Sequence, residues 1–118
     1  MGLEVVHVTL GLAALDFIAR RAFDLVIADI RMPGMNGLET LKAIRTLRSQ
    51  FQKPLIPEIV ITAYDDSAVK KEASRMGVRA FFLKPFELHE FVAAIEKILN
   101  LRGRKHRLHL PKEAIQIK

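Results

Sequence analysis

Residues 24–37 have the sequence DLVIADIRMPGMNG, and this segment predicts both a fold class and a ligand-binding edge. It opens with a short apolar run, Leu25 to Ala28, which lacks polar alternation and is typical of a strand buried on both faces of a parallel sheet. The run ends at Asp29, after which proline and glycine residues indicate a tight turn, and a helical pattern begins at Leu38. Asp29 is therefore predicted at the carboxyl end of a central strand, where open α/β sheets bind their ligands.

The rest of the chain alternates between strand patterns and helical patterns. Strands are predicted at residues 3–8, 25–29, 58–62 and 80–83. Helices are predicted at residues 11–22, 38–48, 67–76 and 87–100, where apolar residues recur at helical spacing. Four β–α units in alternation predict an α/β fold, a parallel sheet with helices on both faces.

The composition indicates one globular domain without a covalent framework. Half of the 118 residues are hydrophobic and none is cysteine, so disulfides and thiolate metal sites are excluded. No apolar run approaches the roughly 20 residues of a membrane span, and the first residues lack a signal-peptide pattern. We therefore expect a cytoplasmic protein without membrane contacts.

The positive charge is concentrated near the end of the chain. Residues 1–100 hold 13 Lys or Arg against 12 Asp or Glu, whereas residues 101–118 hold six against one. The sequence thus predicts a domain over 1–100 and a basic C-terminal tail or linker over 101–118. Basic clusters attract phosphate backbones, but no recognition helix or aromatic platform is evident, so nucleic acid is an expected partner only through this tail.

Two further residues stand at predicted strand ends. Thr62 ends the third strand, and Lys84 ends the fourth, directly before Pro85. Because the carboxyl ends of parallel strands meet at one edge, we expect both side chains to converge with Asp29. A carboxylate that attacks phosphorus, with a hydroxyl and an ammonium that bind the phosphoryl oxygens, is what an acyl-phosphate site requires.

The string Asp-Ile-Arg-Met-Pro-Gly-Met-Asn-Gly at residues 29–37, followed by Thr62 and Lys84, resembles the receiver domains of response regulators in two-component signalling. The resemblance covers roughly residues 3–100 and implies a flavodoxin-like fold and a role in phosphorelay signal transduction. It implies that Asp29 is the phosphoacceptor, Thr62 the switch hydroxyl and Lys84 the phosphate-binding lysine. A sensor histidine kinase or a phosphotransfer protein would be the partner.

The resemblance carries three more expectations. Phe81, three residues before the lysine, would be the switch aromatic. The Lys84–Pro85 peptide bond would be cis. The carbonyl of Arg31 would join Asp29 as a ligand for Mg²⁺.

The chain departs from the family pattern at its start. Receivers begin with a further strand and helix, and that strand ends in an acidic pair that helps to bind Mg²⁺. The first strand predicted here instead ends in Val-His-Val-Thr at residues 6–9, so the chain resembles an N-terminally truncated receiver. Because Mg²⁺ prefers an octahedral oxygen shell with carboxylates, we expect weak or absent Mg²⁺ binding and weak or absent phosphorylation.

The strand that is missing from the pattern normally lies between the strands around Val6 and Ile27. Direct pairing of these two strands could close the gap, as could strand addition by a second copy or by the tail. Residues 114–118 alternate apolar and polar, which is typical of an edge strand. We therefore expect direct closure, with self-association through the surface of the lost helix to give a homodimer.

Alternative functions follow from the same residues. The chain could be a degenerate receiver that acts as an interaction module without phosphorylation. A phosphatase with a strand-end aspartate nucleophile would need a second aspartate two residues later, where the sequence has Arg31, so we do not expect an enzyme. The four histidines show no pairing that indicates a metal site.

Overall fold

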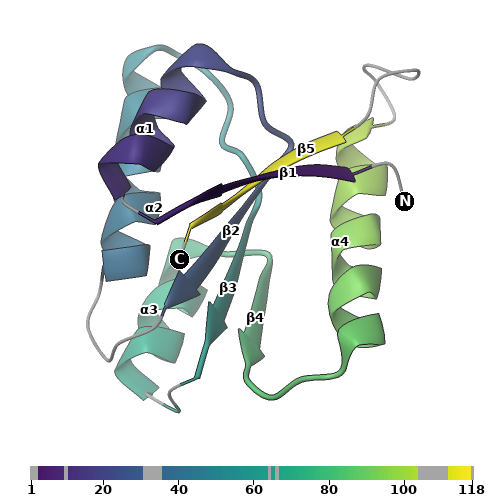
Figure 1. The fold of residues 1–118 in the computed structure, drawn as a ribbon. Coiled ribbons are helices and arrows are strands. Elements are labelled where there is room, and N and C mark those ends of the chain that lie inside the picture. Colours follow the sequence, from purple (N-terminus) through teal and green to yellow (C-terminus); the bar gives the residue numbers. More distant parts are fainter. Residues whose placement is uncertain are drawn as a thin grey trace.

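The computed structural model describes residues 3–9, 11–30, 36–63, 65, 67–103 and 112–117. Within these residues, five strands and four helices follow one another along the chain (Figure 1). In order they are β1 (Leu3–Val8), α1 (Gly11–Arg20), β2 (Leu25–Ile30), α2 (Asn36–Gln50), β3 (Glu58–Thr62), α3 (Ser67–Met76), β4 (Ala80–Leu83), α4 (Leu88–Gly103) and β5 (Lys112–Ile117). The first eight match the elements predicted from the sequence, with ends that differ by at most three residues.

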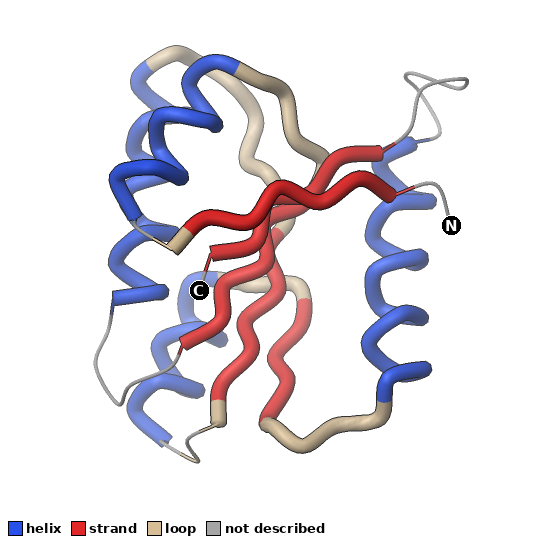
Figure 2. The backbone as a smooth tube through the Cα atoms, viewed as in Figure 1, coloured by secondary structure: helices blue, strands red, loops and turns tan. Residues whose placement is uncertain are grey.

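The strands form one parallel sheet in the order β1-β5-β2-β3-β4 (Figure 2). The first strand in the sequence lies at one edge and the last strand lies inside the sheet. Helices cover both faces, so the α/β fold class predicted from the alternation is confirmed, and the arrangement is flavodoxin-like.

The position of β5 contradicts the predicted direct pairing of the strands around Val6 and Ile27. β5 lies between them and pairs with both, with Ile115 in register with Val6 on one side and with Val26 on the other. The physical reason is that this insertion satisfies the backbone donors and acceptors of three strands at once. It also buries Ala114, Ile115 and Ile117, which direct closure would have left in water.

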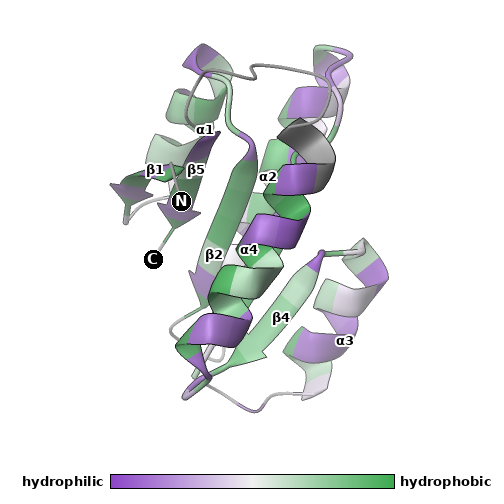
Figure 3. Ribbon diagram, turned by 90° about the vertical axis from the view of Figure 1, so that its right-hand side faces the viewer, coloured by the Kyte–Doolittle hydropathy of each residue, from purple (hydrophilic) through white to green (hydrophobic). Residues whose placement is uncertain are grey.

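The edge-strand pattern of β5 is compatible with a central position because one face of the sheet is only partly covered. Gln116 is half-buried and lies beside His7 of β1, which is exposed. On the same face, Val5 is 37% exposed. Figure 3 shows α4 lying over the other end of this face, beside β2 and β4, with β1 and β5 to one side. A polar residue at this point of the sheet therefore keeps contact with water.

The hydrophobic core has two layers, one on each side of the sheet (Figure 1). Under α1, α2 and α3 the sheet contributes Val26, Val60 and Ile115, among others. Under α4 it contributes Leu25, Ile59 and Ala114, among others. β2 and β3 are buried along their full length, as expected for inner strands of a parallel sheet.

One buried ion pair joins α2 to the sheet at the amino ends of the strands. Glu58, which is almost fully buried at the start of β3, accepts hydrogen bonds from Arg45 Nε at 2.9 Å and from its terminal nitrogen at 2.5 Å. The hydrogen bond to Glu58 raises the pKa of Arg45 above its ordinary value, and partial burial opposes this shift. The pair ties α2, the helix that follows β2 in the chain, to the start of β3.

No helix among the described residues combines the length and the apolar composition that crossing a membrane would require.

Candidate functional site

Asp29 is the fifth of the six residues of β2, at the carboxyl edge of the sheet. It is 8% exposed, although every other residue of this strand is apolar. Its partner in register on β3 is Ile61. The buried strand thus holds a carboxylate at the sheet edge with little contact with bulk water.

Lys84 reaches Asp29 from the end of β4. Its Nζ lies 3.0 Å from Asp29 Oδ2, and the lysine side chain is 44% exposed. The backbone N–H of Lys84 donates to the Thr62 carbonyl oxygen at 2.8 Å, which fixes where the chain leaves the sheet. The Lys84–Pro85 peptide bond is cis, as the resemblance implied. The structure therefore joins the predicted carboxylate and ammonium in one charge-assisted hydrogen bond.

Thr62 is the last residue of β3 and is 1% exposed. It lies in register with Ile30, the residue after Asp29, and with Leu83, the residue before Lys84. The three predicted site residues therefore lie at the ends of three adjacent strands, at one edge of the sheet, as expected from parallel strands. The structure joins Lys84 to Asp29 by a direct side-chain contact, whereas the approach of the Thr62 hydroxyl to them stays a prediction.

Phe81 lies in β4 in register with Val60 and is half-buried against the core beneath α1, α2 and α3. The next residue, Phe82, points to the opposite face and packs with Phe86 and Phe91, with ring centroids 5.2 and 5.4 Å away. The sequence singled out Phe81 but not this cluster of three aromatic rings at the start of α4. The alternation of faces along a strand is the signal that separates Phe81 from Phe82.

The predicted metal site receives no support from the described residues. They contain no group of three or more His, Asp or Glu side chains that could hold a metal ion. Arg31, whose carbonyl was a predicted ligand, lies outside the described residues. On β5, the strand beside Asp29, the last described residue is Ile117, in register with Ala28. Among the described residues, no carboxylate cluster matches the set of oxygen ligands that Mg²⁺ prefers.

Sequence reasoning also did not predict which side chain β5 places at the end of the sheet. Ile117 is buried in register with Val8 and Ala28 and packs beneath α1, α2 and α3, on the face opposite that of Ile61, the register partner of Asp29. The alternating pattern of residues 114–118 was visible in the sequence. Its place in the sheet was not, because strand pairing is decided by contacts far apart along the chain.

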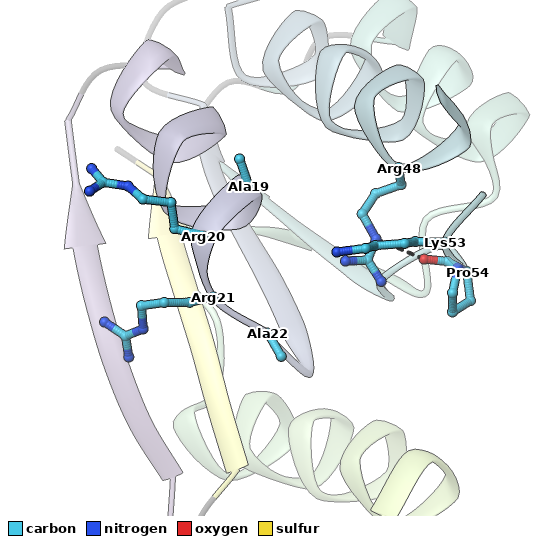
Figure 4. A pocket seen from close by; sticks show the side chains of 7 residues that line it. All are labelled: Ala19, Arg20, Arg21, Ala22, Arg48, Lys53 and Pro54. Carbon is cyan, nitrogen blue, oxygen red and sulfur yellow. Dashed lines mark hydrogen bonds between the residues drawn. The ribbon is translucent and has the colours of Figure 1, made fainter. Parts of the chain in front are cut away.

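A separate hollow lies at the opposite, amino edge of the sheet (Figure 4). Arg48 and Lys53 lie on one side of it, and Arg48 Nε donates to the Pro54 carbonyl oxygen at 2.9 Å. Arg20 and Arg21 lie on the other side, and Figure 4 shows their side chains extending toward β1 and β5. Since it lies far from the strand ends that bear Asp29, this hollow is not part of the candidate phosphoacceptor site.

The parallel sheet with helices on both faces defines a class of protein, the flavodoxin-like α/β proteins, and the Asp29–Lys84 pair marks a candidate site at its carboxyl edge. Comparison with known families identifies the family within this class to which the chain belongs. The family model "Response regulator receiver domain" matches residues 1–96, and the chain belongs to this family, which functions in two-component signalling.

Individual relatives agree with this family. The chain is similar to sporulation initiation phosphotransferase F of Bacillus subtilis, with 33% identity over 102 residues, 86% of this chain and 78% of the relative. It is 30% identical to the sensor protein GacS of Pseudomonas syringae over 117 residues, 99% of this chain but 13% of that protein. Among solved structures, a DNA-binding response regulator of the LuxR family from Staphylococcus aureus superposes with a TM-score of 0.61 at 34% identity, over 75% of this chain and 70% of that one.

Proposed function

We propose that the chain receives a phosphoryl group on Asp29 from a sensor histidine kinase or a phosphotransfer protein. The observation that carries the proposal is the 3.0 Å contact between Lys84 Nζ and Asp29 Oδ2 at the carboxyl edge of the sheet. It provides a nucleophilic carboxylate and a cation in direct contact, with Thr62 on the strand between them. Membership of the receiver family supports the same assignment.

In the proposed reaction, a carboxylate oxygen of Asp29 attacks the phosphorus atom, and the bond from phosphorus to the donor atom breaks. The donor retains the electron pair of that bond and takes up a proton, and an acyl phosphate forms on Asp29. The ammonium group of Lys84 binds an oxygen of the transferred group, and the hydroxyl of Thr62 donates to another. Phe81, beside Val60 on the neighbouring strand, would then respond to the position of Thr62 as the switch aromatic.

The proposal contains no step through Mg²⁺, because the described side chains do not supply its ligands. Without a divalent cation, charge on the transferring phosphoryl group is neutralised mainly by Lys84. We therefore propose that phosphorylation of this chain is weak and that Mg²⁺ binding is weak or absent.

A second candidate function follows from the same observation. In a degenerate receiver, the Asp29–Lys84 pair would hold the sheet edge in one conformation, and the chain would bind a partner without being phosphorylated. The absence of a carboxylate cluster among the described residues favours this alternative. In neither case does the chain act as an enzyme on a separate substrate. A cytoplasmic location and contact of the basic segment with nucleic acid remain predictions from the sequence.

The test is the mass of the intact protein after incubation with acetyl phosphate, with and without Mg²⁺. The first proposal expects a slow gain of one phosphoryl group that Asp29→Asn abolishes. Asp65→Asn is the matched control, because Asp65 is an exposed carboxylate in the loop after β3. A protein that gains no phosphoryl group under any condition, or gains it equally in the Asp29→Asn variant, would leave the interaction module as the supported function.

A further inference from the structure

β5 is held by a recognition site at the amino edge of the sheet. The Asp24 carboxylate accepts a hydrogen bond from the Glu113 N–H at 2.9 Å, and the Asp24 N–H donates to the Glu113 carbonyl oxygen at 2.7 Å. The Arg21 guanidinium donates to the Glu113 carboxylate. Asp24 is 4% exposed, so this contact is built into the buried part of the molecule.

The cation of this site is positioned by aromatic rings. The Arg21 guanidinium carbon lies 5.3 Å from the centre of the Phe23 ring and 6.0 Å from that of Phe17. Such contacts favour one orientation of the guanidinium. Figure 4 shows the Arg21 side chain extending toward β1 and β5. The Glu113 carboxylate, at the second residue of β5, therefore contacts a guanidinium whose orientation the aromatic rings already favour.

The rest of the slot between β1 and β2 favours a strand whose side chains have a suitable size. Ala114 and Ile115 are completely buried, and Ile117 is 4% exposed. Ala114 packs beneath α4, while both isoleucines pack beneath the helices of the other face. The slot thus fits an extended segment with the order acidic, small, β-branched, polar, β-branched, as in Glu113–Ile117.

We infer that this slot is a strand-acceptor site that also takes Lys112–Ile117 from a second copy of the chain, giving a strand-exchanged dimer. Within the part of the chain that the structure describes, β5 makes polar contacts with β1, β2, Arg21 and Asp24, and a strand from another copy would reproduce all of them. The strand exchange therefore keeps the contacts of β5 unchanged. Its free-energy cost is the translational and rotational freedom that two molecules lose when they associate.

The departure of β5 from its own slot in one molecule explains why a second copy of the chain is a suitable partner. Among the described strands, β1 pairs with β5 and with no other, so departure of β5 leaves unpaired edges on both β1 and β2. Free edges of this kind bind extended segments. A second opened copy offers the one segment whose side chains match the slot, together with a slot of its own.

The length of the connection permits the exchange. Eight residues, 104–111, join α4 to β5 in the sequence, and an extended chain of this length spans up to roughly 30 Å. The shortest extent of the molecule is 24 Å. One face of the slot is only partly covered, at Val5 and Gln116. In the dimer, the strand beside each β2 would come from the partner copy, and the inference holds whether or not Asp29 is phosphorylated.

The test uses full-length single-cysteine variants, because the chain has no cysteine of its own. His7 and Gln116 lie in register on β1 and β5, and neighbouring strands are about 4.8 Å apart, within the range that a disulfide bridges. His7→Cys and Gln116→Cys proteins are mixed, incubated at high concentration and oxidised. A mixed disulfide between them reports a β5 strand seated beside the β1 strand of another copy.

The inference expects several-fold more mixed disulfide from this pair than from His7→Cys with Lys70→Cys, whose cysteine lies on α3, and a yield that rises with concentration. Leu3→Cys with Lys112→Cys, a second registered pair, repeats the test if a first variant does not fold. A yield no greater than that of the control pair, with only an intrachain disulfide in the His7→Cys, Gln116→Cys double variant, would show that β5 stays in its own slot.

Discussion

Asp24 and Glu113, 89 residues apart in the sequence, exchange two hydrogen bonds at the amino edge of the sheet. The carboxylate of Asp24 takes the place of a backbone carbonyl and accepts a hydrogen bond from the N–H of Glu113. Since Asp24 immediately precedes β2, this contact sets the register of the inserted strand against the centre of the fold.

Asp24→Ala should destabilise the protein by about 1–3 kcal/mol, because the buried N–H of Glu113 loses its acceptor. Urea denaturation followed by circular dichroism measures the change in the free energy of unfolding. Asp16→Ala is the matched control, since Asp16 forms an exposed pair with Arg20 on α1 and its loss should have little effect on the free energy of unfolding. Equal effects of the two substitutions would argue against the contact that β5 makes with Asp24.

Ile115→Ala should destabilise the protein by about 2–5 kcal/mol, the usual cost of truncating a fully buried aliphatic side chain. The same denaturation experiment measures it. Leu12→Ala on α1 is the control, because that leucine is 81% exposed. A change at Ile115 as small as that at Leu12 would mean that residues 112–117 lie outside the core in solution.

Lys84→Gln should lower the yield of acyl phosphate from acetyl phosphate, since the ammonium that binds the phosphoryl oxygens is lost. Intact mass spectrometry measures the yield. Lys97→Gln, an exposed lysine on α4, should leave it unchanged. If the two variants and the unmodified protein give the same yield, Lys84 takes no part in the transfer.

Mg²⁺ titration should show no saturable site in the micromolar range, because the described residues hold no suitable ligand cluster. Isothermal titration calorimetry measures the binding, with Asp29→Asn as the comparison. Tight binding that Asp29→Asn removes would show that residues beyond those described complete a metal site.

The basic charge of residues 101–118 did not predict their structural role. A charge count separates this segment from the near-neutral body, yet Lys112–Ile117 lies inside the sheet. The alternation of Ala114 to Ile117 is the same for an edge strand and for an inner strand with one partly covered face. The pattern alone therefore favoured the wrong pairing of β1 with β2.

The sequence by itself determined the types and order of the first eight elements and the edge of the sheet at which Asp29, Thr62 and Lys84 lie. Local signals suffice for these features, because apolar periodicity sets the elements and parallel strands end at a common edge. Only the tertiary structure decided what fills the space between β1 and β2. That choice depends on the contacts of Glu113 with Arg21 and Asp24 and on the burial of Ile115, which join residues about 90 positions apart and leave no periodic signal in the chain.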